Sequence, residues 1–422
     1  GMGYQLTYQG GAYRNGLVTN WLDHLGEGSY VQTLLENEDF TEDYWKYLAG
    51  PLGNQWYWAN ISALHFAGWY DIFGNYQIET AMYLNESGLP HAKGNQILIV
   101  DPGGHCPIGD IIWVDDLRGW EIVELYALPA SRAAFKADNV DDFNIHDYFP
   151  HNVWFYVLGP SIEEEGLYWI EADGFPEYTY QYYYINDNNV ISTSKQTTSN
   201  SQTYLYDPMN PVKTWGGNNL EIEPCGPQNQ NVVEKGRTDV LQYNSSVITE
   251  NFAIVGPIWV NLFVSSDAVD TDFVVKIIDV FPNGKRMLVQ DGIYRMRWRN
   301  AQPYFPDYYS FNYNQATKPT LMNKNEIYNI SVQVGHMSYI FNKNHKIGLS
   351  ITSSNYPRFS VNYNSGNNVI DNSTGYTTAN NVIHYGGNYP SNIALPIVDL
   401  NWLQNNKVNW DEFDKKKQEL YK

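Results

Sequence analysis

The chain has 422 residues, of which 17% are charged and 16% aromatic, and its formal net charge at pH 7 is −20. This length and aromatic content predict a folded protein of two or three domains that is rich in strand-forming residues. The acidic balance excludes a nucleic-acid partner, because phosphate recognition needs clustered lysine and arginine. No apolar stretch reaches the roughly 18–20 residues of a membrane span, so we expect no membrane partner.

The histidine and cysteine content predicts neither a metal nor a cofactor site. The nine histidines lack metal-ligand spacing, and two cysteines are too few for a zinc site or a disulfide framework. No signal peptide is recognised within the sequence. A bacterial cytoplasmic location and a periplasmic or secreted one both stay open.

Residues 1–60 have the pattern of an irregular and helical segment. A helix is predicted over residues 30–50, where apolar side chains recur at helical intervals and Gly50-Pro51 ends the pattern. The apolar positions of this helix are Leu34, Leu35, Phe40, Tyr44 and Leu48. A small helical unit is therefore expected ahead of the first strand.

The next part of the sequence predicts a strand, a helix and a second strand. The runs 62–69 and 95–102 are mainly apolar, which is typical of buried parallel strands. Residues 75–87 between them have helical spacing and end at Gly88-Leu89-Pro90. Strand, helix and strand in about 40 residues form a βαβ unit. A parallel sheet covered on both faces is therefore expected here.

A helix is also predicted over residues 119–137, with Pro129 kinking or dividing it. From residue 148 onwards, short β-rich runs separated by Gly, Asn, Pro and Ser turns predict an all-β sandwich. The clearest predicted strands are residues 152–159, 259–266, 273–281, 346–354 and 393–400. The polar stretch 193–203 predicts an exposed loop, and the tail 411–422 a short solvated helix.

Two chemically competent residues follow the two predicted parallel strands. Asp71 stands in GWYDIFGN directly after the first strand, and His105 stands in GGHCP after the second. Carboxyl ends of neighbouring parallel strands meet at one edge of a sheet, where active sites gather. In a serine hydrolase, a carboxylate accepts a hydrogen bond from histidine Nδ1 and stabilises the imidazolium formed when Nε2 takes the nucleophile's proton. The pair therefore fits a catalytic acid and base.

The residues alone leave structural alternatives open. In one alternative Asp71 caps the following helix and His105 is an ordinary loop residue. The acidic pairs Asp115-Asp116 and Asp141-Asp142 offer carboxylates of the kind that glycosidases use. Both pairs sit near predicted helix ends, where solvated caps are the commoner use of acidic residues.

The longer motifs resemble a known family. GWYDIF and DPGGHCP, followed by a β-rich second half, are similar to the X-prolyl dipeptidyl-peptidase family of α/β-hydrolases. That family also contains cocaine esterase, glutaryl-cephalosporanate acylase and α-amino acid ester hydrolase. The more specific matches are residues 204–212, 236–248, 267–299, 353–366 and 383–398. The resemblance extends over nearly the whole chain, and the cocaine esterase and glutaryl acylase branch is the most similar.

The resemblance implies a fold that is α/β plus all-β. Residues 1–60 are expected to be a cap-domain remnant, and 61–147 the C-terminal part of an incomplete α/β-hydrolase domain. Residues 148–422 are expected to form a jelly-roll β-sandwich of the galactose-binding-like type. In this arrangement Asp71 has the role of the triad acid and His105 that of the general base.

The resemblance also implies a substrate pocket. A loop, residues 214–228, would reach the site and bring Leu220 and Cys225 towards it. We expect the pocket to be lined by Trp69, Phe73 and Leu220; core packing is the other interpretation, evenly balanced for Phe73 and favoured for Trp69. A disulfide between Cys225 and Cys106 is the less common outcome, so we expect two free buried thiols.

The family's nucleophile is not found in this sequence. The family places its serine in a Gly-x-Ser-Tyr-x-Gly turn, and no Gly-x-Ser-x-Gly occurs in the 422 residues. GEGSYV at 26–31 has its glycines at the wrong offsets, and GLSIT at 348–352 lacks the closing glycine. Cys106 is a poor substitute, because adjacent loop residues rarely point so that one deprotonates the other. We therefore expect this chain alone to be inactive.

Two classes of function stay open. The first is a serine hydrolase of acyl esters, amides or peptides that works through an acyl-enzyme, of esterase, acylase or dipeptidyl-peptidase type. Its serine would lie on a separate polypeptide that carries the N-terminal half of the hydrolase domain, or be lost from the gene or the expressed segment. The second is a non-catalytic relic, or a binding or assembly module that uses the Trp/Tyr-rich jelly roll. A homo-oligomer is compatible with both.

Overall fold

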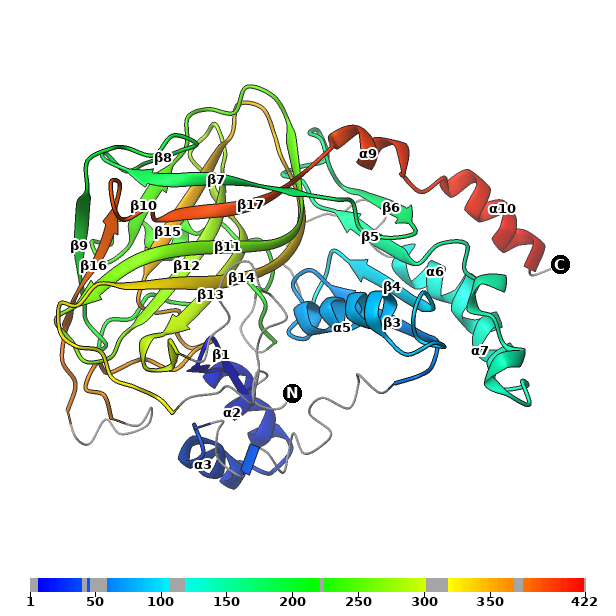
Figure 1. Ribbon diagram of the computed structural model, residues 1–422, viewed down its shortest axis with the longest axis horizontal. Coiled ribbons are helices and arrows are strands. Elements are labelled where there is room, and N and C mark those ends of the chain that lie inside the picture. The colour runs from blue at the N-terminus through cyan, green and yellow to red at the C-terminus, as the bar shows by residue number, and fades with distance from the viewer. Residues whose placement is uncertain are drawn as a thin grey trace.

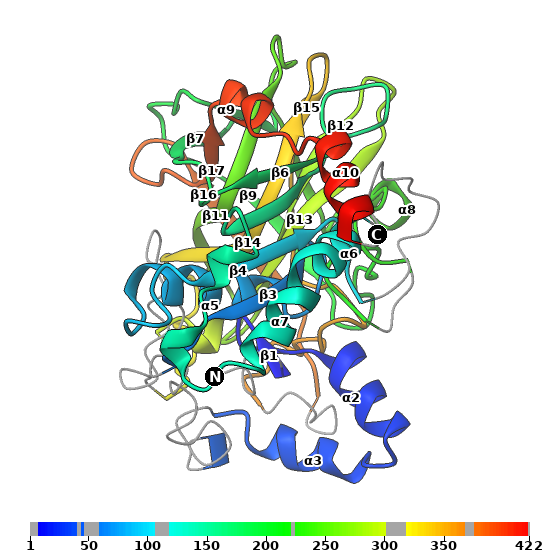
Figure 2. The same cartoon turned by 90° about the vertical axis from the view of Figure 1, so that its right-hand side faces the viewer.

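The structure, a computed structural model, describes residues 7–39, 44–45, 59–105, 118–220, 224–300, 318–367 and 375–420. A small α/β part and a large all-β part lie side by side, and the N-terminal helices α2 and α3 lie at one end of the molecule (Figure 1). The view turned by 90° shows the same arrangement, with α2 and α3 beyond the small sheet (Figure 2).

The N-terminal segment forms a hairpin and two helices. Strands β1 (Tyr8–Gln9) and β2 (Ala12–Tyr13) pair antiparallel, and α2 (Asn15–His24) and α3 (Ser29–Glu36) follow them. Helix α3 confirms the start of the helix predicted over 30–50 but ends at Glu36; most of the remaining prediction lies outside the described residues. The apolar face of α3 packs into a small core of its own, separate from the main one.

The predicted βαβ unit is confirmed. Strand β3 (Ala63–Gly68), helix α5 (Gly74–Ser87) and strand β4 (Gln96–Asp101) follow one another, and β3 and β4 pair parallel. The apolar run of β4 is buried throughout, as expected of a parallel strand covered on both faces. Helix α5 packs against both strands.

The small sheet has two more strands than the βαβ unit supplies. Strand β5 (Val153–Val157) pairs parallel with β4, and β6 (Tyr168–Ala172) pairs antiparallel with β5, so the strand order is β3-β4-β5-β6. The boundary expected at residue 147/148 is therefore wrong as a division between sheets. A short apolar strand such as β5 fits a parallel sheet and a sandwich equally well by pattern.

The tail also returns to the small sheet. Helices α9 (Leu400–Asn405) and α10 (Trp410–Leu420) follow the last strand, and α10 confirms the predicted C-terminal helix. Arg118 bridges α6 and α10 through Asp414, with 2.7 Å between Nη1 and Oδ1. The region 148–422 is thus divided between both parts of the molecule.

The helix predicted over 119–137 is divided, as the position of Pro129 indicated. It consists of α6 (Arg118–Ile122), a π-helical turn η2 (Val123–Ala127) and α7 (Leu128–Ala134). Pro129 lies in the first turn of α7, where its missing N–H costs little. Two short 3₁₀ turns, η3 (Val140–Asp142) and η4 (Ile145–Asp147), lead into β5.

The all-β part is an eleven-stranded sheet in the described chain, and its strands wrap around a common interior (Figures 1 and 2). The strands are β7 (Thr179–Asn186), β8 (Val190–Ser192), β9 (Asn200–Tyr206), β10 (Leu241–Asn244), β11 (Phe252–Ser266), β12 (Asp272–Val280), β13 (Arg286–Arg295), β14 (Tyr328–Phe341), β15 (Lys346–Thr352), β16 (Ala379–Tyr385) and β17 (Asn392–Val398). Short helices α8 (Asn231–Glu234) and η5 (Met296–Trp298) connect them. The predicted all-β texture is confirmed, but the predicted loop 193–203 ends early because β9 begins at Asn200.

Ion pairs are buried inside the all-β part. Arg295 is bidentate to Asp272, with both N–O distances at 2.8 Å, and Lys276 Nζ lies 2.9 Å from Glu234 Oε1. All four side chains are at most 2% exposed. Charges this deep are tolerated only when they are paired and hydrogen-bonded, and Asn362 supplies a further donor to Asp272.

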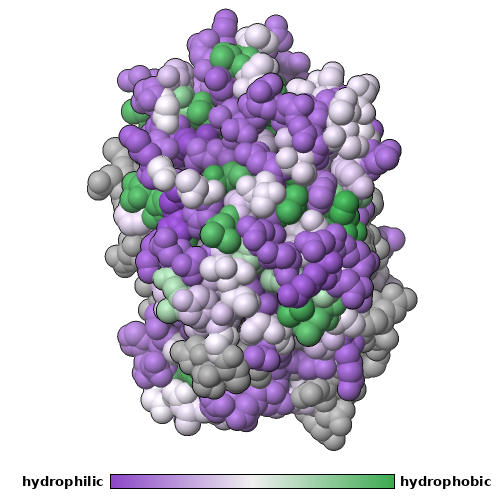
Figure 3. All heavy atoms as spheres, turned by 90° about the vertical axis from the view of Figure 1, so that its left-hand side faces the viewer, coloured by the Kyte–Doolittle hydropathy of each residue, from purple (hydrophilic) through white to green (hydrophobic). Residues whose placement is uncertain are grey.

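The surface has no broad apolar area on the face of the all-β part shown in Figure 3. That face is mostly hydrophilic, with small separated hydrophobic spots. Across the described segments, no helix combines the length and the apolar character needed to cross a bilayer.

Candidate active site

Asp71 and His105 lie together at one edge of the small sheet. Strands β3 and β4 are in parallel register, with Gly68 beside Asp101 at their carboxyl ends, and the two residues stand in the loops that follow. His105 Nδ1 donates a hydrogen bond to Asp71 Oδ2. The expectation that neighbouring strand ends bring the pair together agrees with this geometry.

Both oxygens of the Asp71 carboxylate accept hydrogen bonds. Oδ1 accepts from the backbone N–H of Phe73 at 2.7 Å, while Oδ2 faces His105. The N-cap residue of α5 is Phe73, so Asp71 closes the turn before the helix and does not cap it. The Asp71 side chain is 15% exposed and that of His105 is 43% exposed. Among the described residues, no hydrogen-bond partner of His105 Nε2 is found.

The two loops approach each other too closely for side chains at two glycines. Tyr70 N donates to Gly103 O and Trp69 N to Asp101 O, each at 3.0 Å. A Cβ on Gly104 would lie 2.5 Å from Tyr70 O, which is closer than real Cβ atoms come to any backbone atom. A Cβ on Gly68 would clash with Gly103 O in the same way, so Gly68 and Gly104 together allow the loop of β4 to pack against the loop of β3.

The all-β part holds the loop that carries Asp71. Tyr70 Oη donates to Val289 O at 2.9 Å, and Gln290 Nε2 donates to Trp69 O at 3.2 Å, both from β13. Asn218 Nδ2 donates to Trp69 O and to Asp71 O, each at 3.3 Å. Sequence reasoning missed these residues, because polar side chains about 150 to 220 positions away leave no local signal.

A buried arginine from the N-terminal segment adds to this support. Arg14 Nη1 donates to Ile72 O at 3.5 Å, and Nη2 donates to Asn218 O at 3.4 Å. Its burial, and next the charge of Arg358, lower the pKa of Arg14 to about 9. Three segments of the chain therefore meet behind the loop of Asp71.

The expected pocket residues separate into two groups. Trp69 is 2% exposed in the main core, where its Nε1 donates to Tyr156 O at 2.7 Å. Phe73 and Leu220 both pack against the small N-terminal core, and the Phe73 ring meets the His105 ring edge-on with centroids 5.5 Å apart. Phe73 thus contacts His105, Leu220 packs against the same small core as Phe73, and Trp69 has the packing role that was its other interpretation.

The remaining candidate residues have other surroundings. Cys225 is buried and disulfide-bonded, so the expectation of a free thiol is wrong for it; Cys106 lies outside the described residues. Asp115 and Asp116 also lie outside them, and the exposed Asp142 accepts from Asn139 N in a surface turn. No cluster of three or more His, Cys, Asp or Glu in the described segments could hold a metal ion.

The chain is similar to known proteins in both sequence and fold. Residues 151–394 match the family model of the X-Pro dipeptidyl-peptidase C-terminal non-catalytic domain. Cocaine esterase from Rhodococcus sp. is 38% identical over 210 residues, which are 49% of this chain and 34% of that protein. The chain thus spans between a third and a half of the length of the curated relatives that it matches.

Two solved structures share the fold over nearly all of the chain. An aminopeptidase from a marine sediment Thaumarchaeota archaeon has a TM-score of 0.70 and 20% identity, covering 92% of this chain and 63% of that one. An α-amino acid ester hydrolase has a TM-score of 0.69 and 17% identity, covering 92% of this chain and 64% of that one. At these identities the likeness concerns the fold alone.

Proposed function

Because the chain belongs to the X-Pro dipeptidyl-peptidase and cocaine esterase family of hydrolases, we propose that it carries the acid and the base of a serine hydrolase. Its substrates would be acyl esters, amides or peptides. The observation that carries the proposal is the hydrogen bond from His105 Nδ1 to Asp71 Oδ2 at the open edge of a parallel sheet. This bond fixes the tautomer that leaves Nε2 as the proton acceptor.

The proposed reaction passes through an acyl-enzyme. His105 Nε2 takes the proton of a serine hydroxyl as its oxygen attacks the substrate carbonyl, and Asp71 stabilises the imidazolium. The imidazolium then gives this proton to the leaving alcohol or amine as the bond to the acyl carbon breaks. In the second half His105 takes a proton from water, whose oxygen attacks the acyl-enzyme, and returns it to the serine. The acid product and the free serine are then released.

We place the serine on residues outside these 422, because the sequence holds no Gly-x-Ser-x-Gly. The outer edge of β3 supports this, since no described strand pairs with it. Leu64 on β3 is 37% exposed, and Trp120, which stacks on Phe66, is 59% exposed. A segment that adds strands at this edge would complete an α/β-hydrolase sheet, beside a jelly-roll sandwich formed by the all-β part.

Residues next to Asp71 indicate the acyl group. By the family resemblance, Ile72, Phe73 and Gly74 stand where α-amino acid ester hydrolases have acidic residues that hold a substrate ammonium. With apolar side chains there, and the Phe73 ring against His105, we propose an acyl group without a free α-amine. The separation of this branch from the amino-acid esters rests on these three positions.

The test begins with the chain alone. We expect no hydrolysis of p-nitrophenyl esters and no labelling by a fluorophosphonate probe. A stoichiometric adduct on one of its own residues would contradict the missing nucleophile. The DNA upstream of the Met2 codon is then read for a frame that encodes Gly-x-Ser-Tyr-x-Gly, and that polypeptide is expressed with this chain.

The combined protein should hydrolyse the esters and be labelled on the added serine. Asp71→Asn should lower kcat by a factor of about 10⁴, because the imidazole loses its orienting partner. Asp141→Asn is the matched control, since Asp141 pairs with His91 at 3.6 Å on the surface, and it should leave kcat unchanged. Equal activity of both variants would rule out the catalytic role of Asp71.

A second candidate is a non-catalytic binding module. It is favoured by a row of tyrosines, Tyr180, Tyr182 and Tyr184, which alternate along β7 and therefore share one face. The rings of Tyr182 and Tyr184 are stacked with centroids 6.3 Å apart. Titration with oligosaccharides under fluorescence detection tests it: saturable binding that Tyr184→Ala weakens, without any activity in the combined protein, would support this candidate over the enzyme.

A further inference from the structure

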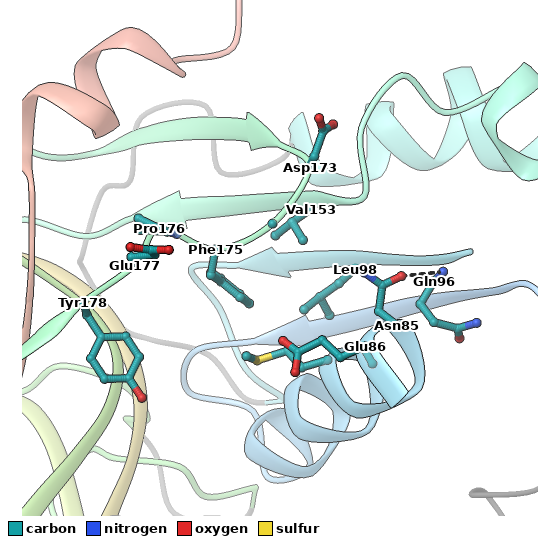
Figure 4. Close-up of a pocket in the computed structure, with 13 residues that line it drawn as sticks. Asn85, Glu86, Gln96, Leu98, Val153, Asp173, Phe175, Pro176, Glu177 and Tyr178 are labelled. Atoms are coloured by element: carbon teal, nitrogen blue, oxygen red, sulfur yellow. Dashed lines mark hydrogen bonds between the residues drawn. The ribbon is translucent and has the colours of Figure 1, made fainter. Parts of the chain in front are cut away.

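A pocket of about 560 Å³ lies away from the candidate active site. It is formed by the second half of α5, the first residues of β4 and β5, and the connection from β6 to β7 (Figure 4). Asp71 and His105 follow the opposite ends of the strands. The five-residue step along β4 from Gln96, in the pocket, to Asp101 separates the two sites by roughly 16 Å.

One part of the pocket lining is apolar. Met82 from α5, Leu98 from β4 and Val153 from β5 line it together with Phe175 of the connection. Figure 4 shows the Phe175 ring between the connection and the α5 side of the pocket. Ligand pockets commonly have volumes of about 300–1,000 Å³ and a lining of this kind, so the pocket has the size and surface for a compact apolar group.

The other part of the lining is negatively charged. Glu86 at the end of α5 and Glu177 in the connection both line the pocket, and neither has an ion pair or hydrogen bond with a described residue. Asp173 also lines it but pairs with His151 at 2.8 Å. None of the thirteen lining residues is Lys, Arg or His. Glu86 and Glu177 are both exposed residues at the mouth of the pocket, and no described lining residue supplies a cation to their carboxylates.

The helix end adds to this negative potential. Helix α5 ends at Ser87 with no basic residue in its last turn, so the negative end of its dipole is not compensated. Tyr178 lies beside Glu177 on the rim and offers an aromatic face, which attracts cations. The carboxylates would repel an anion, and a neutral ligand would lack the charge attraction that a cation gains from them.

We propose that this pocket binds a small organic cation that joins an ammonium group to a compact apolar body, such as an arylalkylammonium. The apolar body packs against Met82 and Phe175, and the ammonium group lies between Glu86 and Glu177. The site is independent of the proposed hydrolase activity, because it shares no residue with the Asp71–His105 pair.

The experiment compares phenethylammonium with 2-phenylethanol, which has the same shape without the charge. Calorimetric titration at low salt should give saturable binding of the ammonium with a Kd of about 1 mM or tighter, and binding of the alcohol at least about tenfold weaker. Equal binding of the two compounds, or no saturable binding of the ammonium, would overturn the proposal.

Matched variants separate the pocket from the general acidity of the chain. Glu86→Gln with Glu177→Gln should weaken ammonium binding at least about tenfold. Glu163→Gln with Glu250→Gln removes the same charge from exposed positions that do not line the pocket, and should leave the Kd unchanged. If both pairs weaken binding alike, the ammonium binds through the net charge and the pocket is not a site.

A methyl spectrum locates the ligand directly. The chain has seven methionines, so a protein labelled at the methionine methyls gives few signals, and Met82→Leu assigns the one in the pocket. Phenethylammonium should shift the Met82 signal through its ring current, and the exposed Met209 signal should stay in place. An unmoved Met82 signal, or an equal shift of Met209, would contradict the assignment of the pocket.

Discussion

The two parts of the molecule differ in what they do with charge. The small α/β part leaves the side chains of Asp71 and His105 15% and 43% exposed, in loops at the edge of a four-stranded sheet. The all-β part buries several ion pairs, such as Arg295 with Asp272, and almost completely excludes these from solvent. One part thus holds a hydrogen-bonded Asp–His pair that solvent reaches, and the other pairs opposite charges inside its own interior.

Hydrogen bonds between the two parts nevertheless connect the all-β part to the loop of Asp71. Tyr70 and Trp69, which lead into Asp71, are held by Val289 and Gln290 of β13. The matched family model describes this second part as a non-catalytic domain. A domain of this kind can therefore still affect the site, because its hydrogen bonds fix the backbone that carries Asp71.

The largest effect on the free energy of unfolding is expected at a buried ion pair of the all-β part. Asp272→Ala leaves Arg295 buried without its carboxylate, so the free energy of unfolding should fall by about 3–5 kcal/mol. Urea denaturation followed by tryptophan fluorescence measures this. A loss below about 1 kcal/mol would mean that water reaches the guanidinium. The all-β part would then not differ from the α/β part in keeping its charged side chains away from solvent.

A pH-dependent effect is expected at the border between the parts. His336 on β14 donates its backbone N–H to Asn75 of α5 at 2.8 Å, and burial lowers the pKa of its imidazole from 6.5 to about 3. Below about pH 6.5 the unfolded chain therefore binds a proton at His336 that the folded chain does not bind. The free energy of unfolding consequently falls as the pH falls towards 3.

His336→Leu should remove this contribution. Between pH 7 and pH 5 the wild type should lose about 2 kcal/mol more than the variant, measured by urea denaturation at both pH values. Parallel loss in the two proteins would show that His336 takes up its proton in the folded state, and hence that water enters between β14 and α5.

A smaller effect should connect the two parts to the site. Tyr70→Phe removes the hydrogen bond to Val289 O and should cost about 1 kcal/mol of unfolding free energy. It should also shift the NMR signal of the His105 Nδ1 proton, because the loop of Asp71 is released. Tyr243→Phe is the control: it removes the buried bond to Gln202 at 2.9 Å inside the all-β part and should leave His105 unchanged. The same spectrum in both variants would mean that the all-β part does not position Asp71.

The smallest effect is expected on the surface of the α/β part. Asp414→Asn breaks the pair with Arg118. The Asp414 side chain is 43% exposed and that of Arg118 is 25% exposed, so the free energy of unfolding should fall by roughly 0.2–1 kcal/mol. The cost should fall further in high salt, because exposed pairs are screened. A loss as large as that of Asp272→Ala would remove the distinction between the two kinds of ion pair.

The sequence predicted the βαβ unit and the meeting of Asp71 with His105 because both depend on local pattern. Continuous apolar strands on either side of a helix have few arrangements, and the parallel register then places both loops at one edge. The interruption of the helix near Pro129 could also be predicted, because proline lacks the N–H that a helix uses and therefore affects the turn in which it lies.

The rest depended on contacts between distant segments. Strand β5 is apolar at every position, and such a run does not say which sheet it joins. The hydrogen bond from Tyr70 to Val289 spans 219 positions, and tyrosine is common in this chain. The disulfide state of Cys225 was likewise not decided by the count of cysteines, because pairing depends on where the fold brings them.

No strand in the described part of the chain pairs with the outer edge of β3, and this has a consequence for how the chain behaves at high concentration. The strand reads Ala-Leu-His-Phe-Ala-Gly and has no proline, lysine or acidic residue to discourage a second strand from joining it. Two copies can therefore associate edge to edge, with the exposed Leu64 at the contact. We expect precipitation or reversible clustering to set in with rising protein concentration, and a lysine in place of Leu64 to delay it.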